Sequence, residues 1–405
     1  MTTAWVGLAV AIVAVVATGV IWVPSRPRLP VTAADIDADF TAEQRQREES
    51  FHQALRRWGY LSLFLGLMIP TVLTGSGFVA RLTNAVTTTW VISAGVAVTF
   101  ISLTTWLLGL LPAMKSRQVM VEFGLATGSW ARWWRDAVLA ELIGLAMTIA
   151  AVLALVAAAR NWPDNWWIPV AVGAVLVVLL LSFVLPVVIE PLFNSFTPLA
   201  AGDLRNSLLA LAQDDGVQIR EVLVADASKR TSALNAYVSG LGPTRRIVVH
   251  DNLLDRGHDD EVVAVVAHEL GHVVAKDVFF GTVAGAGGAA AVVFGSALLL
   301  NTPAVLAWGH IAGAGDPAVA GVLLTGAVWL SFLLSPLMNG ISRRIEREAD
   351  EHCFDLTHDP DAVVRMHQAL ALHNIAALQP HPLRYTWFAS HPSSPERIKA
   401  ARLHG

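Results

Sequence analysis

Residues 259–300 read DDEVVAVVAHELGHVVAKDVFFGTVAGAGGAAAVVFGSALLL, and this stretch joins two kinds of sequence. The first part, Asp259–Lys276, is predicted to be a helix, and it begins with acidic residues that favour the positive end of a helix dipole. The second part, Phe279–Leu300, is uncharged and apolar over a length that suits a membrane span, which needs about 20 residues. The sequence therefore predicts a polar helix that is followed directly by a membrane span.

The composition of the whole chain agrees with a membrane protein. Of its 405 residues, 54% are hydrophobic and only 15% are charged, whereas a soluble domain carries roughly 25% charge. A disordered chain would have the opposite composition, and a single cysteine, Cys353, excludes a scaffold held by internal disulfides. The net charge of −4 gives no basic footprint, so we expect no nucleic-acid partner.

Seven stretches are long and apolar enough to cross a bilayer. The first lacks a basic leader and a small-residue cleavage site, so we expect a retained helix and not a signal peptide. The predicted spans are Trp5–Val23, Tyr60–Val79, Trp90–Leu111, Val138–Ala158, Trp167–Val188, Phe279–Leu300 and Val319–Leu337. The predicted fold class is a mainly α membrane protein with seven transmembrane helices, surrounded by a lipid bilayer.

The basic residues between these spans indicate an orientation. Loops 25–59 and 112–137 hold six and four Lys or Arg residues, whereas the loops on the other side hold one or none. By the positive-inside rule we expect the N-terminus outside and both loops in the cytoplasm, together with residues 190–278 and 341–405. Arg outnumbers Lys 24 to 4 and Ala and Val are abundant. This is typical of a GC-rich bacterial genome, so we expect a bacterial plasma membrane.

Alternation of apolar and polar regions predicts how the chain is organised. Residues 1–189 form a membrane region of five spans, and residues 279–340 carry spans six and seven. Residues 190–278 form a small α+β segment, too short for a large core of its own, which we expect to pack against residues 341–405. The elements predicted in the α+β segment are a helix at Leu204–Gln213 and strands at Glu221–Asp226, Asn235–Ser239 and Arg246–His250, the last two joined by a hairpin turn.

The letters HELGH at 268–272 match the pattern H-E-x-x-H. On a helix, positions i and i+4 share a face, so His268 and His272 can reach one Zn²⁺ at about 2.0–2.1 Å. Glu269 can then reach an activated water and act as general base. Two stray histidines on a surface helix are the alternative, but the motif lies on a predicted helix after a predicted strand. The sequence therefore predicts one zinc ion per chain.

A catalytic zinc site also needs a third protein ligand and an open position. From the residues alone, Cys353, an aspartate, a glutamate or another histidine could supply this ligand. The stretch SRRIEREAD at 342–350 places Glu346 and Asp350 on one helical face. One carboxylate could bind the metal, and the other an imidazole or the substrate. A solvated charged face explains the same spacing.

Together these segments resemble the integral-membrane zinc metallopeptidases typified by the type I CAAX prenyl protease, which are related to the HtpX peptidases. The resemblance covers nearly the whole chain, and the ordered set of motifs is more specific than HELGH alone. It departs at Ala126, where the family commonly has asparagine. The matching polar stretches are 190–199 (EPLFNSFTPL), 226–239 (DASKRTSALNAYVS), 246–254 (RIVVHDNLL), 268–272, 342–350 and 390–398 (SHPSSPERI).

This resemblance implies a fold and several residue roles. It implies a zincin-type (gluzincin) catalytic domain in which Glu346 is the third zinc ligand and Asp350 a proton donor. It also implies that His391, on a turn before a proline, faces the metal cleft and helps to stabilise the oxyanion.

Asn235, Ala236 and Tyr237 lie on an expected edge strand. An edge strand can bind extended peptide by β-augmentation, which would present a substrate backbone to the zinc. An ordinary half-buried strand is the alternative.

The predicted function is a zinc-dependent membrane endopeptidase that hydrolyses peptide bonds of membrane-associated proteins or peptides. The resemblance implies prenylated C-a-a-X proteins as substrates, but a bacterial source favours general proteolysis or quality control. A site-2-type protease would hold HELGH inside an apolar span. A non-enzymatic scaffold or transporter with a structural zinc site would carry paired charges within its spans, and these are nearly absent.

Overall fold

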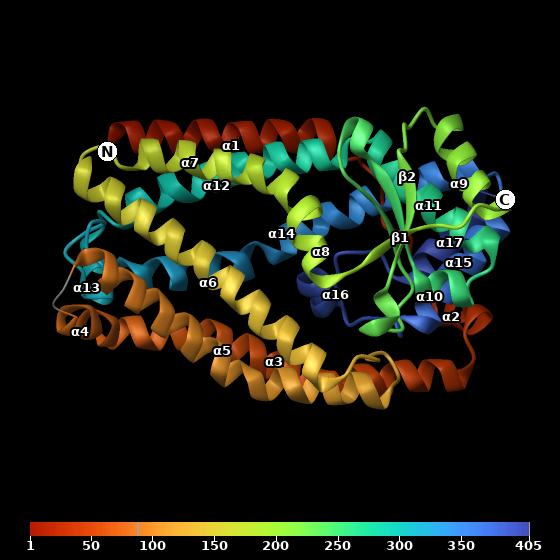
Figure 1. Ribbon diagram of the computed structural model, residues 1–405, viewed down its shortest axis with the longest axis horizontal. Coiled ribbons are helices and arrows are strands. Elements are labelled where there is room, and N and C mark those ends of the chain that lie inside the picture. The colour runs from red at the N-terminus through yellow and green to blue at the C-terminus, as the bar shows by residue number, and fades with distance from the viewer. Residues whose placement is uncertain (87–88, 405) are drawn as a thin grey trace.

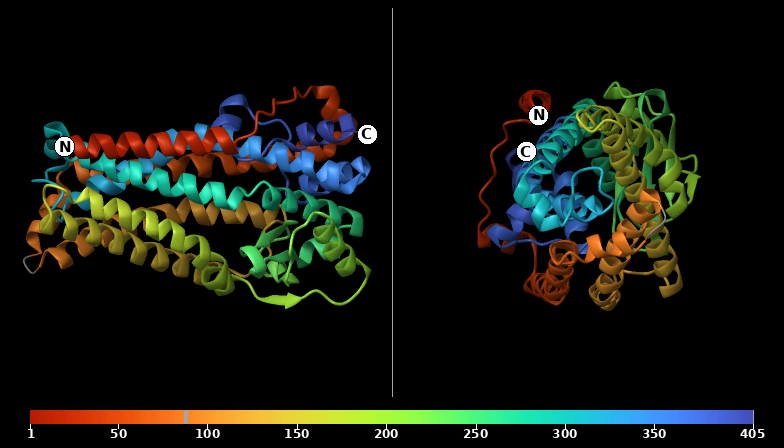
Figure 2. Two further views of the ribbon diagram at one scale, coloured as in Figure 1. Left: turned by 90° about the horizontal axis from the view of Figure 1, so that it is seen from above. Right: turned by 90° about the vertical axis from the view of Figure 1, so that its left-hand side faces the viewer.

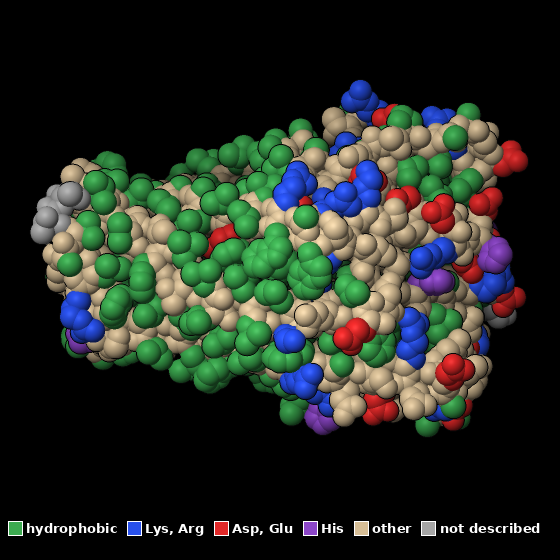
Figure 3. Space-filling view, turned by 60° about the horizontal axis from the view of Figure 1, so that its bottom comes forward, with side chains coloured by type: hydrophobic (Ala, Val, Ile, Leu, Met, Phe, Trp, Pro, Cys, Tyr) green, Lys and Arg blue, Asp and Glu red, His purple; other side chains and the backbone are tan. Residues whose placement is uncertain are grey.

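The structure is a computed structural model that describes residues 1–86 and 89–404. The molecule is elongated, with long helices at one end and a mixed α/β part at the other (Figures 1 and 2). Hydrophobic side chains cover much of the helical end, whereas charged side chains gather over the α/β end (Figure 3). This division of the surface is the one that a membrane protein with an extramembrane part requires.

Among the described residues, seven helices are long and apolar enough to cross a membrane, as the sequence predicts. Many of their large apolar side chains are exposed, a surface that suits lipid tails. The seven are α1 (Thr2–Trp22), α3 (Ala42–Gly75), α5 (Trp90–Glu122), α6 (Trp130–Asn161), α7 (Trp167–Val184) with the turns η1 (Leu185–Ile189) and α8 (Glu190–Phe193), α12 (Asp277–Leu299) and α14 (Val319–Thr357). The short helices α4 (Phe78–Ala85) and α13 (Pro303–Gly309) lie at the end far from the sheet (Figure 1).

Two of these helices extend far beyond their apolar stretches. α3 has 34 residues and α14 has 39, which makes them about 50 and 60 Å long at a rise of 1.5 Å per residue. In α3 the polar residues before the second span are therefore part of the same helix as the span. That span ends earlier than predicted, at Gly75, because Gly77 adopts a left-handed conformation with φ 70° and α4 begins after it.

Residues 190–276 and 341–404 form a polar lobe around a four-stranded sheet of order β1-β2-β4-β3. β2 and β4 are parallel, and the two outer pairs are antiparallel. Within the described residues β3 pairs only with β4, so it is an edge strand, as predicted. The sequence did not reveal β1, because three residues are too few for alternation to show. The strands are β1 (Phe196–Pro198), β2 (Glu221–Ala225), β3 (Ala236–Ser239) and β4 (Arg246–His250).

One hydrophobic core joins both segments of the polar lobe. Ile247 and Val249 of the sheet share this core with Leu270 and with Met366 from the C-terminal segment. The short α+β segment thus uses the C-terminal residues to complete its core, as expected. The remaining elements are α2 (Ala33–Asp39), α9 (Asp203–Asp214), η2 (Ala227–Lys229), η3 (Gly242–Thr244), α10 (Asp251–Arg256), α11 (Asp259–Val274), α15 (Pro360–His373), α16 (Pro382–Phe388) and α17 (Ser394–His404).

The N-terminal segment reaches from the membrane end to the polar lobe. α1 lies along α12 in Figure 1 and in the left view of Figure 2, and the two helices are in contact. After α1 the chain crosses to α14, where Arg26 Nε donates to Glu348 at 2.7 Å. It then reaches α17, where Lys399 pairs with Asp35 at 3.0 Å. Residues 1–40 are therefore bound to both halves of the molecule.

Candidate active site

Helices α11 and α14 meet at the HELGH stretch. Gly271 lies at their contact, where a Cβ atom would stand 3.1 Å from the Cα atom of Ala349 and 3.1 Å from Cβ of His352. Those distances are shorter than ordinary van der Waals contact, so a side chain at this position would push the two helices apart. The glycine of HELGH therefore sets how closely the histidines of α11 approach α14.

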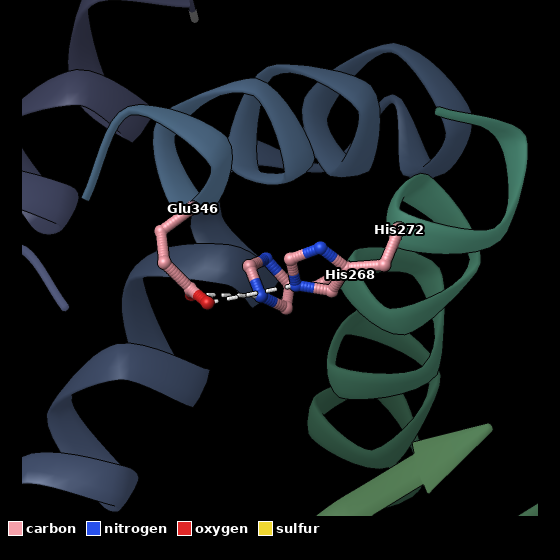
Figure 4. Close-up of side chains that lie close together, drawn as sticks. All are labelled: His268, His272 and Glu346. Carbon is pink, nitrogen blue, oxygen red and sulfur yellow. Dashed lines mark ion pairs between the residues drawn. The ribbon is translucent and has the colours of Figure 1, made fainter. Parts of the chain in front are cut away.

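Three side chains converge where these helices meet, and Figure 4 shows them pointing toward one another. His268 and His272 lie one turn apart on α11 with perpendicular rings, whose centroids are 4.9 Å apart. Nε2 of His268 lies 3.3 Å from Oε2 of Glu346, and Nε2 of His272 lies 3.7 Å from Oε1. One ligand atom from each residue lies within 4.8 Å of the others.

This spacing fits a metal ion. Ligand atoms about 2.05 Å from a tetrahedral zinc are separated by about 3.4 Å, close to the two observed nitrogen–oxygen distances. Oε2 of Glu346 is buried and has no hydrogen-bond donor among the described residues, a costly state that a cation would relieve. Two imidazoles and one carboxylate are also a ligand set known from catalytic zinc sites.

A carboxylate holds the other nitrogen of each histidine. Nδ1 of His268 lies 2.9 Å from Oδ1 of Asp350, and Nδ1 of His272 lies 2.7 Å from Oδ2 of Asp277. An Nδ1–H that donates to a carboxylate fixes the imidazole tautomer and orients the ring. Both Nε2 lone pairs are thereby directed to the side where Glu346 lies.

Asp350 and Arg397, here called the lobe-side pair, lie together inside the polar lobe. Nε of Arg397 donates to Oδ2 of Asp350 at 2.8 Å, and the Asp350 residue is only 3% exposed. Arg397 is therefore engaged in an ion pair within the lobe. A buried carboxylate engaged with two donors is well suited to hold His268, whereas proton donation by Asp350 stays a prediction.

The polar groups around the HELGH stretch also change its acid–base properties. Desolvation raises the pKa of Glu269, although His268 and His272 oppose the rise. Burial and Arg397 lower the pKa of His268, but the carboxylates of Asp350 and Glu346 beside it outweigh them and raise it to about 9. Without a metal, His268 is thus protonated near neutral pH, so a proton occupies the place suited to a cation.

His391 lies on the open side of the site, in the loop between α16 and α17. Its Nε2 lies 3.3 Å from Oε1 of Glu346, and its side chain is 58% exposed. The Ser390 hydroxyl lies 2.8 Å from Nδ1 of the same ring. The structure therefore brings His391 beside Glu346, and its help to the oxyanion stays a prediction.

The expected peptide-binding residues lie around the start of β3, which packs against α11. Asn235 precedes the strand and is exposed, and its carbonyl accepts a hydrogen bond from the backbone N–H of His250. Ala236 is buried in the core at 1% exposure, and Tyr237 is half-buried on the opposite face of the sheet. Asn235 has an exposed side chain, whereas buried Ala236 can offer a substrate its backbone alone.

The sequence did not reveal the role of Asp277, which holds His272, or of Trp22, which holds Asp277. Asp277 binds Nδ1 of His272, and the indole N–H of Trp22 donates to Oδ1 of Asp277 at 2.6 Å. In the sequence Asp277 only follows the predicted polar helix, and Trp22 lies 255 residues away from Asp277. A pattern within one sequence gives no signal for such a contact.

Sequence models of two families match the chain. The model described as peptidase family M48 matches residues 198–404. The model described as the CAAX prenyl protease N-terminal region, with five membrane helices, matches residues 23–195. Membrane helices and a converging His–His–Glu group define the class of integral-membrane metallopeptidases. Within that class, the chain belongs to peptidase family M48.

Individual relatives agree with this assignment. An uncharacterized metalloprotease of Bacillus subtilis, YhfN, is 32% identical over 287 residues, which are 70% of this chain and 67% of that protein. CAAX prenyl protease 1 of Saccharomyces cerevisiae is 30% identical over 261 residues, and its homolog in Arabidopsis thaliana is 33% identical over 230. These alignments cover 59% and 55% of this chain, and 56% and 52%, about half, of those two relatives.

A solved structure has the same fold. The crystal structure of Saccharomyces mikatae Ste24p superposes with a TM-score of 0.81 and covers 98% of both chains at 21% sequence identity. The arrangement of seven membrane helices and a small sheet is therefore that of a known membrane protein.

Proposed function

We propose that the chain is a zinc-dependent endopeptidase that hydrolyses peptide bonds of membrane-associated proteins or peptides. The observation that carries this proposal is the convergence of His268, His272 and the unbonded Oε2 of Glu346. Glu269 stands beside the first of these residues in the sequence. One zinc ion per chain, with the three converging residues as its ligands, fits the donor set and its spacing.

The residues of the site divide the chemistry of hydrolysis among them. Zinc, when bound, supplies the Lewis acidity that activates water and polarises a carbonyl. Glu269 accepts the proton of the attacking water and delivers it to the leaving amine. Asp350 or His391 assists the tetrahedral intermediate, and the exposure of His391 beside buried Asp350 favours His391 as the oxyanion donor.

A peptide substrate would lie extended along β3, with Asn235 at the open end of that strand. The relatives named CAAX prenyl proteases suggest C-terminal peptides of prenylated proteins as one substrate class. The Arg-rich, Ala- and Val-rich composition suggests a bacterium, and there we favour proteolysis or quality control of membrane proteins. The positive-inside rule puts the polar lobe in the cytoplasm of such a cell, with the N-terminus outside.

A cleavage assay with detergent-purified protein and a denatured membrane substrate tests the proposal. The Glu269→Gln variant should lose cleavage while it retains one equivalent of zinc, because it lacks only the general base. Glu346→Ala should lose zinc as well, and a chelator should stop the wild-type enzyme. Undiminished cleavage by Glu269→Gln would refute the assigned role.

The substrate class needs a separate experiment. Membrane-protein C-termini can be compared by proteomics between cells with the wild-type protein and cells with Glu269→Gln. Accumulation of uncleaved C-a-a-X tails would support the prenylated class, whereas accumulation of varied damaged or misfolded membrane proteins would support quality control.

A further inference from the structure

The contacts of His272 lead out of the polar lobe and into the membrane helices. We propose that Asp277 and Trp22, here called the membrane-side pair, are positioning residues for the metal site. Through this pair the first membrane helix, α1, sets how tightly His272 binds zinc. The inference rests on the proposed function, because it takes His272 as a zinc ligand.

The carboxylate of Asp277 is fixed by one donor on each oxygen. Oδ2 lies 2.7 Å from Nδ1 of His272, and Oδ1 accepts the indole N–H of Trp22 at 2.6 Å. The Asp277 side chain is only 14% exposed, so water competes weakly for either contact. A carboxylate with both oxygens bound cannot rotate, and the imidazole that it holds keeps its orientation.

This geometry requires a bend between α11 and α12. In one continuous helix, residues five positions apart lie about 140° apart around the axis, so Asp277 would point away from His272. Lys276 breaks the helix with φ 57° and ψ 36°, a left-handed conformation that costs a non-glycine residue about 1–2 kcal/mol. The strained Lys276 turns the chain so that the carboxylate of Asp277 meets the imidazole of His272.

The indole of Trp22 is positioned by the packing of α1 on α12. Its ring stacks on Phe280 with centroids 6.4 Å apart and planes 20° apart. Gly281 lies against the same ring: a Cβ atom there would be 3.6 Å from it. Because α1 contacts α12 along its length, the indole N–H is delivered to Asp277 only when α1 is docked (Figure 2).

The same N-terminal segment also contacts the helix of the third ligand. Arg26 Nε donates to Glu348 at 2.7 Å, and Arg26 Nη1 lies 3.5 Å from Glu351. Both acids lie on α14, near Glu346. The N-terminal segment thus contacts α14, which carries Glu346, and α12, whose Asp277 holds His272.

The test measures zinc affinity of the full-length protein in detergent, by competition with a chelating dye. Asp277→Ala should weaken zinc binding 10- to 100-fold, the range for residues that hold a metal-bound imidazole. Asp277→Asn should be intermediate, because one amide oxygen must serve two donors. Trp22→Phe keeps an aromatic ring on Phe280 but loses the N–H, so zinc binding should weaken several-fold.

A matched control and a double variant separate this role from a general effect on folding. Trp329→Phe also removes an indole hydrogen bond, to Thr71 Oγ1 at 3.0 Å, but between α14 and α3, about 25 Å along α14 from Glu346. Its zinc affinity should equal that of the wild type. Adding Trp22→Phe to Asp277→Ala should weaken binding no further, because Trp22 acts through Asp277.

The outcomes distinguish this inference from the proposed function. Wild-type affinity in Asp277→Ala, or equal losses in Trp22→Phe and Trp329→Phe, would overturn the positioning role and leave the zinc site standing. Full zinc occupancy in His272→Ala would overturn the zinc site itself. If Asp277→Ala fails to fold, as judged by thermal unfolding without zinc, then Asp277→Asn and Trp22→Phe decide the matter.

Discussion

The two histidines of HELGH are held by different parts of the molecule. His268 is buried and bound by the lobe-side pair, whose members belong to the helices of the polar lobe. His272 is more exposed and bound by the membrane-side pair, where the lobe joins α1 and α12. One half of the site is therefore fixed by the core of the lobe, and the other half by how the lobe sits on the membrane helices. Three experiments test this difference.

The largest effect is expected from Asp350→Ala. This change leaves the buried guanidinium of Arg397 without its main partner, which typically costs 3–5 kcal/mol. Asp277→Ala leaves the indole of Trp22 and the partly exposed imidazole of His272 without an acceptor, so it should cost less stability. Denaturant unfolding of both purified variants measures the difference. In Asp350→Asn combined with Arg397→Gln both members of the ion pair are neutral, so part of the loss should return. A larger loss in Asp277→Ala would contradict the expected order.

Gly271→Ala should affect both halves of the site equally. The new Cβ would stand 3.1 Å from the Cα atom of Ala349, so α11 and α14 must separate, at about 1–3 kcal/mol. Zinc affinity should fall together with stability, because the two histidines move away from Glu346. Gly288→Ala on α12 is the control. A Cβ atom at this position would meet nothing within 4 Å, so the change should be neutral or slightly stabilising. Unchanged zinc binding in Gly271→Ala would mean that helix spacing does not limit the site.

The third expected effect is a pH dependence on the His268 side. Burial lowers the pKa of His268, but the carboxylates of Asp350 and Glu346 outweigh it and raise the pKa to about 9 in the zinc-free protein. A raised pKa means that protonated His268 stabilises the zinc-free fold below pH 6.5, and that this contribution is lost as the pH rises through 9. Zinc must displace the proton, so its affinity should rise about tenfold per pH unit between 6.5 and 9.

Calorimetry in buffers of different ionisation enthalpy counts the proton that zinc releases. Asp350→Asn should reduce this release, because it removes a charge that raises the pKa of His268. Zinc affinity that is constant across the same pH range would contradict the prediction.

Local patterns were enough to predict the larger elements of the fold. Charge gaps located the seven spans, and H-E-x-x-H located the helix that carries both histidines. Helix ends were less predictable, because hydropathy marks only the part of α3 or α14 that meets lipid. β1 could not be predicted because its three residues form a strand by pairing with β2 and not through a pattern of their own.

The part of the candidate site that could be predicted is the pair of residues four positions apart on one helix. His268 and His272 share a helical face by that spacing, whereas the resemblance was needed to choose Glu346. The membrane-side pair could not be predicted. Its role depends on a left-handed residue, Lys276, and on the docking of a helix from the other end of the chain.

The order of the ligands along α11 and α14 also has a consequence for biosynthesis. Glu346 follows the last membrane span on the same uninterrupted helix, whereas the histidines precede the last two spans. A nascent chain that has not yet inserted α12 and α14 holds two of the three converging residues and lacks the third. The three converging residues therefore come together only at the end of membrane insertion, after the last span has been placed.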